Sequence, residues 1–260
     1  MKLKDNVSVV TGAGSGIGRE IALAFGREGG RVGVCDIDLA AAEETVAMII
    51  REGHGDGMAV RMDVTSEEEV DAGVDAIHRH WGRIDTLVSN AGVQIVHPIE
   101  EFPYDEFRKV VTIHLDGAFL TTKACVRHMY RQRSGALIYM GSVHSHEASP
   151  LKSAYVAAKH GILGLARVMA KEGAAHGVRS NVICPGFVRT PLVEKQIPAQ
   201  AASLGISEQE VVERVMLGGT VDKEFTTMAD VAEVAVFLAA FPTSALTGQS
   251  VVVSHGWHMN

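Results

Sequence analysis

The chain has 260 residues, of which 47% are hydrophobic, and it carries a net charge of −7 at pH 7. This composition predicts a globular protein, long enough for one α/β domain with a sizeable core. The negative charge and the scattered Lys and Arg residues argue against nucleic acid as a partner. A membrane span is not expected either, because no run of about 18 apolar residues occurs. Three dispersed cysteines and an N-terminus without a signal-peptide core favour the cytoplasm.

Short runs rich in Val and Ile alternate along the chain with segments of helical periodicity. The predicted strands are Val7–Thr11, Arg31–Cys35, Met58–Met62, Ile84–Ser89, Ala136–Met140, Arg179–Ile183 and Ser250–Val253. The predicted helices lie near 17–28, 38–52, 66–80, 104–130, 153–175 and 228–240. The strands lack strict alternation, as expected when both faces are buried. Residues 1–260 are therefore expected to form a single Rossmann-type domain, a doubly wound sheet of about seven parallel strands with helices on both faces.

Residues 190–221 break this rhythm, because they place helix-like segments between the sixth strand and the last helix. Additional sequence of this kind is usually functional, and we expect a helical lid over a substrate site. The alternative is an insertion without a role in the site.

A glycine-rich turn, Thr11–Gly18, follows the first predicted strand and has the spacing G-x-x-x-G-x-G on Gly12, Gly16 and Gly18. Glycines let the backbone turn tightly and approach a diphosphate, and the helix that follows offers its N-terminal amides. At the end of the second strand, the Asp36 carboxylate can accept hydrogen bonds from the adenosine ribose and repel a 2′-phosphate. This favours NAD over NADP. Alternatively, Asp36 caps the next helix.

Two further strand ends fit the same nucleotide. Asp63-Val64 follows the third strand, where a carboxylate and an amide can meet adenine, and Asn90-Ala91-Gly92 follows the fourth, where small residues let the chain pass close to a ribose. Ligands of open α/β sheets bind at the carboxyl ends of strands. Each segment alone could be a plain turn, but together they predict one binding site.

Ser142, Tyr155 and Lys159 are the candidate catalytic residues. A Tyr and a Lys four residues apart share one face of a helix. An ammonium held about 4 Å away would lower the tyrosine pKa from about 10 by a few units, which makes the phenol a general acid/base near neutrality. A solvated helix face is the alternative interpretation of this spacing.

Together these motifs resemble the short-chain dehydrogenase/reductase family over the whole chain, including its Pro-Gly turn at Pro185-Gly186 and its nicotinamide-contacting Thr at Thr190. The resemblance implies that Tyr155 is the acid/base, that Ser142 polarises the substrate oxygen, and that Lys159 holds the nicotinamide ribose. The implied NAD-binding residues are Gly12, Ser15, Gly16, Ile17, Gly18, Asp36, Asp63, Val64, Asn90, Ala91, Gly92, Tyr155, Lys159, Pro185, Gly186, Val188 and Thr190.

The chain departs from the family pattern at His114. The family usually has an Asn at this position of the fourth helix, where it supports a water relay to the lysine. An imidazole can both donate and accept a hydrogen bond, so His114 is kept as a catalytic candidate. A histidine that only packs in the helix is an equally good interpretation.

Gln94, His144, Lys152 and Gln196 form a donor-rich set at positions that can face the nicotinamide end of the site. Two amides, an imidazole and an ammonium suit a small carboxylate substrate. Taken singly, each of the four could be an ordinary surface residue.

Within the family, these positions are similar to those of bacterial enzymes that oxidise (R)-3-hydroxybutyrate. The resemblance implies that Gln94, His144, Lys152 and Gln196 hold the substrate carboxylate, and that Trp257 belongs to the pocket. Phe187 stands where some members carry Trp and is expected to pack over the methyl end of the substrate. The expected reaction is reversible, NAD-dependent oxidation to acetoacetate. The alternatives are another small hydroxy acid, a sugar alcohol or a 3-oxoacyl thioester.

Two expectations concern ions and assembly. His144, His146 and Glu147 lack a further ligand at plausible spacing, so no metal site is expected. By analogy with the family, a homotetramer is expected through the segments 104–130, 153–175 and 250–253.

Overall fold

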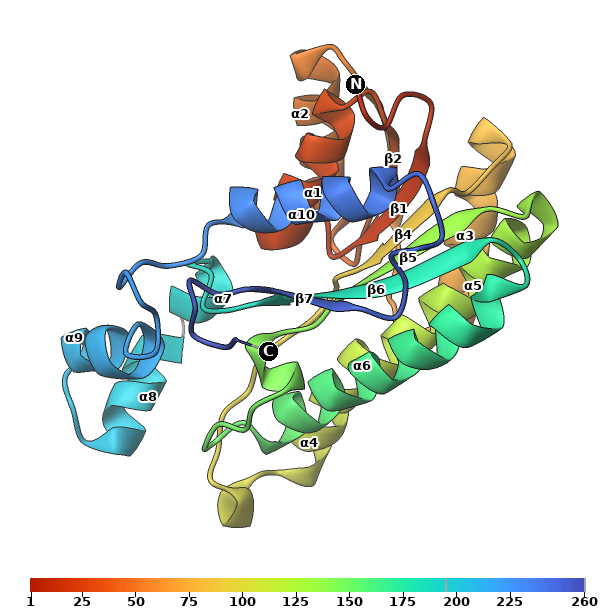
Figure 1. Cartoon of the computed structure of the whole chain (residues 1–260). Helices are drawn as coiled ribbons and strands as arrows, with labels where there is room; N and C mark the ends of the chain where they lie inside the picture. The colour runs from red at the N-terminus through yellow and green to blue at the C-terminus, as the bar shows by residue number, and fades with distance from the viewer. Residues whose placement is uncertain (195, 260) are drawn as a thin grey trace.

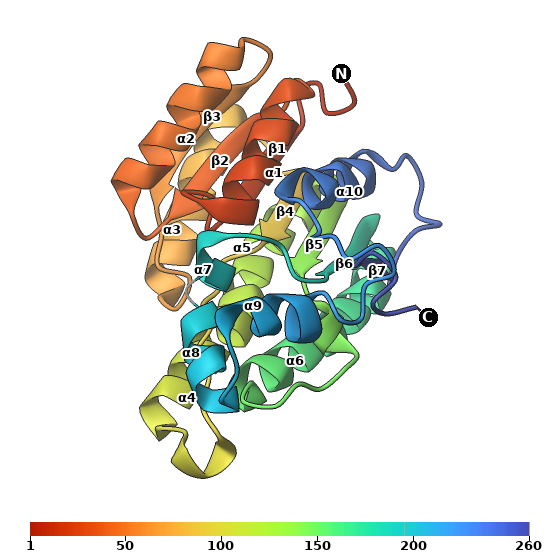
Figure 2. The same cartoon turned by 90° about the vertical axis from the view of Figure 1, so that its left-hand side faces the viewer.

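The computed structural model describes residues 1–194 and 196–259. Within this range seven parallel strands form one sheet, in the order β3-β2-β1-β4-β5-β6-β7 (Figures 1 and 2). The strands are β1 (Val7–Thr11), β2 (Arg31–Asp36), β3 (Asp56–Arg61), β4 (Thr86–Ser89), β5 (Gly135–Met140), β6 (Val178–Pro185) and β7 (Ser250–Val253). The predicted doubly wound fold is confirmed. The strand order reverses between β1 and β4, and a ligand crevice opens at such a switch point.

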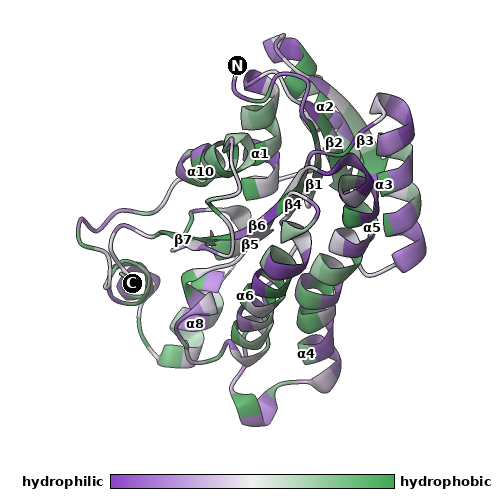
Figure 3. Cartoon of the chain, turned by 45° about the vertical axis from the view of Figure 1, so that its right-hand side comes forward, coloured by the Kyte–Doolittle hydropathy of each residue, from purple (hydrophilic) through white to green (hydrophobic). Residues whose placement is uncertain are grey.

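Helices cover both faces of the sheet (Figure 1). One face carries α1 (Gly16–Arg27), α2 (Leu39–Glu52) and α10 (Met228–Ala240). The other carries α3 (Glu67–Trp81), α5 (Gly117–Gln132) and α6 (Ser153–Ala174). Alternate residues of each strand serve the two sides, so that Val10 packs in one core and Val9 in the other. Figure 3 shows the apolar strands between helices whose outer faces are polar. Burying each such side chain contributes about 1.5–3 kcal/mol.

Several strand boundaries differ from those predicted. β3 runs from Asp56 to Arg61 rather than from Met58 to Met62, because this stretch pairs with the whole of β2. β4 begins at Thr86 rather than Ile84, whose backbone N–H and C=O both bond to the Gln132 side chain. β6 extends through Pro185 because its last residues pair with β7.

The predicted continuous helix 104–130 is wrong. The π-helical segment η2 (Thr112–Asp116) separates α4 (Tyr104–Val111) from α5. A π-turn inserts an additional residue and rotates the side chains that follow, and such turns are frequent at functional sites. His114 lies in this turn and is buried.

The insertion folds as short helices beyond the carboxyl ends of β6 and β7 (Figures 1 and 2). Its elements are α7 (Pro191–Glu194), α8 (Gln196–Leu204), α9 (Glu208–Glu210) and the π-helical η4 (Val211–Met216). Short 3₁₀ turns, η1 (Ile99–Glu101) and η3 (Val143–Ser145), follow β4 and β5. Lys195, inside the predicted lid, lies outside the described residues. Across 1–194 and 196–259, none of the helices has the length and apolar character needed to cross a bilayer.

Candidate active site

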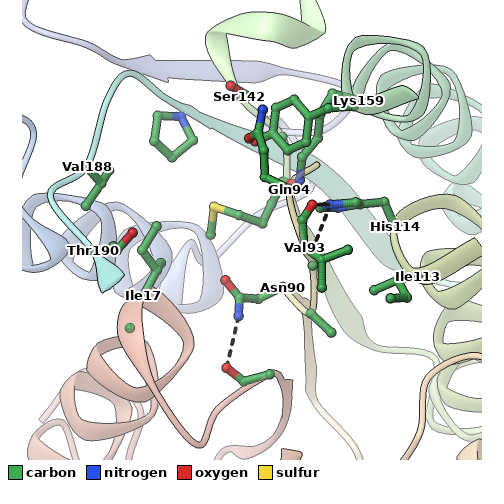
Figure 4. Close-up of a pocket in the computed structure, with 18 of the residues that line it drawn as sticks. Ile17, Asn90, Val93, Gln94, Ile113, His114, Ser142, Lys159, Val188 and Thr190 are labelled. Atoms are coloured by element: carbon green, nitrogen blue, oxygen red, sulfur yellow. Dashed lines mark hydrogen bonds between the residues drawn. The ribbon is translucent and has the colours of Figure 1, made fainter. Parts of the chain in front are cut away.

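A cavity of about 410 Å³ runs along the carboxyl ends of the central strands (Figure 4). Gly12 and Asp36 line one end, and Gln196 and Trp257 line the other. The structure brings every predicted site residue to this cavity except Gly18. The lining residues that the sequence did not indicate are Ile37, Met62, Val93, Ile113, Met140, Gly141 and Val193. Most of them are next in sequence to a predicted site residue, and only this adjacency could have indicated from the sequence that they line the cavity.

The glycine turn lies between β1 and α1. Gly12 and Gly16 have φ values of +62° and +55°, which residues other than glycine rarely adopt. Gly16 faces open space, whereas a Cβ at Gly18 would lie 2.2 Å from the Gly12 carbonyl oxygen. Gly18 therefore packs against the backbone of the turn and does not line the cavity. The turn leaves a backbone surface at the N-terminus of α1 that fits a diphosphate.

Asp36 is fixed at the rim of the cavity. Its Oδ2 accepts a 2.8 Å hydrogen bond from the Gly14 amide, and its Oδ1 accepts a 3.0 Å bond from the Asp38 amide. The N-cap of α2 is Asp38, which accepts from the Ala41 amide. The alternative in which Asp36 caps this helix is therefore wrong. Its carboxylate is held beside the glycine turn instead.

Thr11 ties the glycine turn to the end of β4. Its Oγ1 accepts hydrogen bonds from the amides of Asn90 and Ala91 at 3.0 and 3.1 Å. The Asn90 side chain in turn donates to the Thr11 carbonyl at 2.9 Å. These bonds set the spacing between the two strand ends across which a dinucleotide would lie.

Ser142, Tyr155 and Lys159 come together from two elements. Ser142 follows β5, and its hydroxyl accepts from the His144 amide at 3.1 Å as the N-cap of η3. Tyr155 and Lys159 lie on α6. The Lys159 ammonium is buried, donates a 2.6 Å hydrogen bond to the Met140 carbonyl, and lies 5.3 Å from the centre of the Tyr155 ring. Figure 4 shows Ser142 and Lys159 on the same side of the pocket.

The sequence predicted a lowered pKa for Tyr155, and this prediction is wrong for the protein without a bound ligand. Burial raises the pKa of Tyr155 to about 12, and the hydrogen bond with Ser142 opposes this by less. Burial also lowers the pKa of Lys159 to about 7. Desolvation penalises the charged form of each group and is the largest cause of both shifts.

His114 lines the same wall. Its Nε2 lies 2.7 Å from the Val93 carbonyl oxygen (Figure 4). The same Nε2 lies 3.2 Å from the Val93 amide nitrogen, and the shorter contact with the carbonyl favours the tautomer with the proton on Nε2 and the lone pair on Nδ1. Nδ1 is buried and has no hydrogen-bond partner in the described part of the chain. Burial first, and the Lys159 charge second, lower the pKa of His114 to about 3. The ring is neutral at physiological pH and stands edge-on to Tyr155 at 5.3 Å.

The four predicted substrate residues meet at the other end of the cavity. Lys152 Nζ lies 3.4 Å from His144 Nε2. Lys152, His144 and Gln196 are buried. Burial lowers the pKa of Lys152 to about 8, and burial with the Lys152 charge lowers that of His144 to about 4. Gln94 Nε2 is buried without a hydrogen-bond partner among residues 1–194 and 196–259.

Two aromatic rings close this end. Phe187 and Trp257 stack with centroids 5.1 Å apart and planes at 9°. His144 meets both rings edge-on, and Lys152 Nζ lies 4.8 Å from the Phe187 centroid. The donors and the apolar rings therefore lie against one another at this end of the cavity.

Comparison with known proteins places this geometry in a family. The family model for short chain dehydrogenases matches residues 6–201. The chain belongs to the short-chain dehydrogenase family. It is 39% identical to an uncharacterized oxidoreductase of Bacillus subtilis, over 98% of this chain and 99% of the relative. It is 38% identical to a D-beta-hydroxybutyrate dehydrogenase of Rhizobium meliloti, over 96% and 97% of the two chains. Among solved structures, an NAD⁺-bound xylitol dehydrogenase superposes with a TM-score of 0.91 at 30% identity, over 97% of this chain and 99% of that one.

As a member of this family, the protein is an oxidoreductase that uses a nicotinamide cofactor. The residues present fit such a group, because the Gly16 backbone faces open space and Asp36 is held beside the glycine turn, where it can meet a ribose. Asn90 follows β4, between the glycine turn and the candidate catalytic trio, and Asp63 follows β3, on the other side of Asp36. The arrangement can hold a dinucleotide along the strand ends with its reactive end beside Tyr155.

Proposed function

We propose that this dehydrogenase oxidises (R)-3-hydroxybutyrate to acetoacetate reversibly, with NAD as cofactor. The observation that carries the proposal is the buried donor Gln94 Nε2, which has no hydrogen-bond partner among the described residues and lines the same cavity as Tyr155 and Lys152. Buried polar groups are almost always paired in native proteins, so unpaired donors in a pocket indicate a ligand acceptor. The D-beta-hydroxybutyrate dehydrogenase of Rhizobium meliloti supports the choice of substrate.

The protonation state of His144 strengthens the argument for a carboxylate. Lys152 can only donate, so the lone pair at its 3.4 Å contact lies on His144 Nε2. The proton of this neutral imidazole is therefore on Nδ1, on the side where the Glu147 backbone accepts a hydrogen bond. The Lys152 ammonium and the Gln94 amide N–H line the same cavity as this ring. Charge-assisted hydrogen bonds make such a space selective for a carboxylate.

The size and walls of this end of the cavity favour a short substrate. Phe187 and Trp257 form an apolar surface beside the donors, which suits a methyl group. A carboxylate held by the donors and a methyl on this wall would fix the hydroxyl-bearing carbon near Tyr155. Such positioning supplies much of the rate acceleration in reactions of this type.

The proposed chemistry divides between the cofactor and the protein. Bound NAD would supply the acceptor for the hydride that leaves C3 of the substrate. Ionised Tyr155 takes the proton from the C3 hydroxyl, and Ser142 donates a hydrogen bond to the same oxygen. Lys159 would hold the nicotinamide ribose and, in its protonated form, add positive charge beside the phenol. Burial raises the pKa of Tyr155, so the positive charge that an oxidised nicotinamide would bring beside it would favour the ionised phenol.

The preference for NAD rests on Asp36. Its carboxylate lines the cavity and is oriented by two backbone amides. A fixed negative charge there accepts hydrogen bonds from ribose hydroxyls and repels a 2′-phosphate. The neighbouring Ile37 is exposed and uncharged and offers nothing to a phosphate.

Assembly into a homotetramer is also proposed. The exposed Phe119 on α5 and Val168 on α6 offer apolar surface on the two helices expected to pair. A monomer in light scattering at assay concentration would contradict this assembly.

The test of the reaction is the appearance of NADH when purified protein is mixed with NAD and one enantiomer of 3-hydroxybutyrate. Turnover of the (R) form with little turnover of the (S) form is expected. Absence of (R) turnover would refute the substrate. Xylitol and a 3-hydroxyacyl thioester serve as parallel substrates, because activity on either in place of the acid would support the alternative specificities.

A further inference from the structure

Two arginines lie beside Asp36, and each is bound by a glutamate. The Arg19 guanidinium donates to the Gly14 carbonyl, while the Gly14 amide donates to Asp36 Oδ2 at 2.8 Å. One residue therefore separates the arginine from the carboxylate. Arg19 Nη2 is paired with Glu44 Oε2 at 2.6 Å, and its Nε donates to Thr45 Oγ1 at 3.1 Å. Glu44 and Thr45 lie on α2, the helix that follows Asp36.

The second arginine approaches from the neighbouring strand. Arg61 is the register partner of Asp36 across β2 and β3. Its Nη1 is paired with Glu69 Oε2 at 2.8 Å, and Glu69 lies in the first turn of α3. Arg19 and Arg61 both lie near Asp36, and each forms an ion pair with a glutamate of a flanking helix.

We propose that Glu44 and Glu69 are specificity-determining residues that exclude a 2′-phosphorylated cofactor. This inference rests on the proposed use of NAD. By engaging Arg19 and Arg61, the two glutamates leave the Asp36 carboxylate as the group that meets the 2′ position of the adenosine ribose. Phosphate recognition depends on an available guanidinium. A guanidinium that must first leave a carboxylate gives up most of that advantage.

Glu44 gives the sharper test, because Glu69 also accepts a hydrogen bond from the Asp63 amide in the cofactor site. The variants are Asp36→Ser, which removes the direct repulsion, and Asp36→Ser combined with Glu44→Gln. The probes are ADP-ribose and 2′-phospho-ADP-ribose, titrated calorimetrically into the full-length protein. We expect the double variant to bind the phosphorylated probe about tenfold more tightly than Asp36→Ser, with ADP-ribose binding changed by less than about twofold.

Glu43 supplies the matched control, since it is the exposed neighbour of Glu44 on the same helix and carries the same charge. Glu43→Gln in the Asp36→Ser background is expected to change binding of the phosphorylated probe by less than about twofold, because Arg19 is paired with Glu44 and the exposed charge of Glu43 is screened. Adding Arg19→Gln to the double variant should remove the gain. Equal effects of Glu43→Gln and Glu44→Gln would overturn the proposal, as would a gain that survives Arg19→Gln. Thermal melting curves confirm that each variant is folded.

The wild-type protein separates this inference from the proposed cofactor. If it binds 2′-phospho-ADP-ribose as tightly as ADP-ribose, the proposed preference for NAD is refuted. The proposed role of Glu44 and Glu69 is then refuted as well. If it prefers ADP-ribose and the Glu44 and Glu43 variants behave alike, only the role of the glutamates is refuted.

Discussion

Lys159 Nζ donates a 2.6 Å hydrogen bond to the carbonyl oxygen of Met140, the last residue of β5. This bond anchors the ammonium to the sheet, although the lysine belongs to α6. The charge is thereby fixed relative to Ser142, which follows β5 two residues later, and not only relative to Tyr155 on its own helix. The strand end sets the geometry of all three catalytic groups.

Replacing Lys159 with Met is expected to lower kcat for hydroxybutyrate oxidation by about 10²–10³-fold. The phenol would lose the protein cation nearest to it, and the Met140 carbonyl would lose its partner. Steady-state rates measure the effect. Lys171→Met, on the exposed surface of the same helix, is the control and should leave kcat unchanged. Comparable rates for wild type and Lys159→Met would exclude the role assigned to Lys159.

The oxidation rate is expected to rise with pH above neutrality. Burial raises the pKa of Tyr155, so the ionised phenol needed to take the proton becomes more abundant as pH increases. Acetoacetate reduction needs the protonated phenol and should fall only at alkaline pH. Initial rates in both directions between about pH 6 and pH 10 show the two opposite profiles. Tyr155→Phe should abolish turnover, and an oxidation rate that falls as pH rises would argue against Tyr155 as the base.

Replacing Lys152 with Met is expected to raise KM for hydroxybutyrate by about 10–100-fold, because a charge-assisted hydrogen bond to the carboxylate is lost. The pKa of Lys152 is about 8, so the wild-type KM should also rise as pH passes above that value. KM measured across this range, with KM for NAD followed in parallel, tests both statements. A wild-type KM that stays flat through pH 8 would contradict the carboxylate contact, as would a change confined to NAD.

His114 is expected to act through the unpaired Nδ1 lone pair and not through charge. His114→Leu should lower kcat about tenfold, whereas His114→Asn, which keeps a hydrogen-bonding group, should retain most of it. The solvent isotope effect on kcat should increase in the Leu variant if proton transfer has become slower. Equal activities of the two variants would assign His114 a packing role.

A Gly219→Ala substitution is expected to loosen substrate specificity. A Cβ at Gly219 would lie 2.3 Å from Trp257 Cδ1, so the indole must move away from Phe187. The ratio of kcat/KM for five-carbon over four-carbon 3-hydroxy acids should rise by several-fold, because one methylene is worth about 1–3 kcal/mol. Gly164→Ala, where a Cβ meets open space on α6, is the matched control. An unchanged ratio would show that Trp257 does not bound the pocket.

The sequence was sufficient for the parallel sheet and for the meeting of distant residues at one cavity, because parallel strands all end at the same edge. It was sufficient for Asp36 and Tyr155, whose positions follow from a strand end and a helix face. The exact residues at which the strands begin and end could not be predicted as well. Ile84 has a strand-like sequence, but a side chain from α5 satisfies its backbone.

The pKa of Tyr155 shows a second limit. The four-residue spacing places a lysine nearby, but it does not report how much of the phenol is desolvated by other elements. The π-turn at His114 and the supporting role of Gly18 likewise depend on neighbours from elsewhere in the chain. At Gly18 these are the Gly12 carbonyl and the Asn90 side chain.

The insertion has an apolar cluster of its own, formed by Ile197, Ala201, Val211 and Met216 and separate from the two cores that flank the sheet. A segment packed on itself can open as one cooperative unit while the sheet stays folded. Phe187 touches this cluster and also stacks on Trp257 at the pocket wall. Amide hydrogen exchange in residues 196–216 should therefore slow when substrate is present. All of these amides should slow together and exchange at a similar rate, because a ligand in contact with Phe187 raises the free energy of opening the whole cluster.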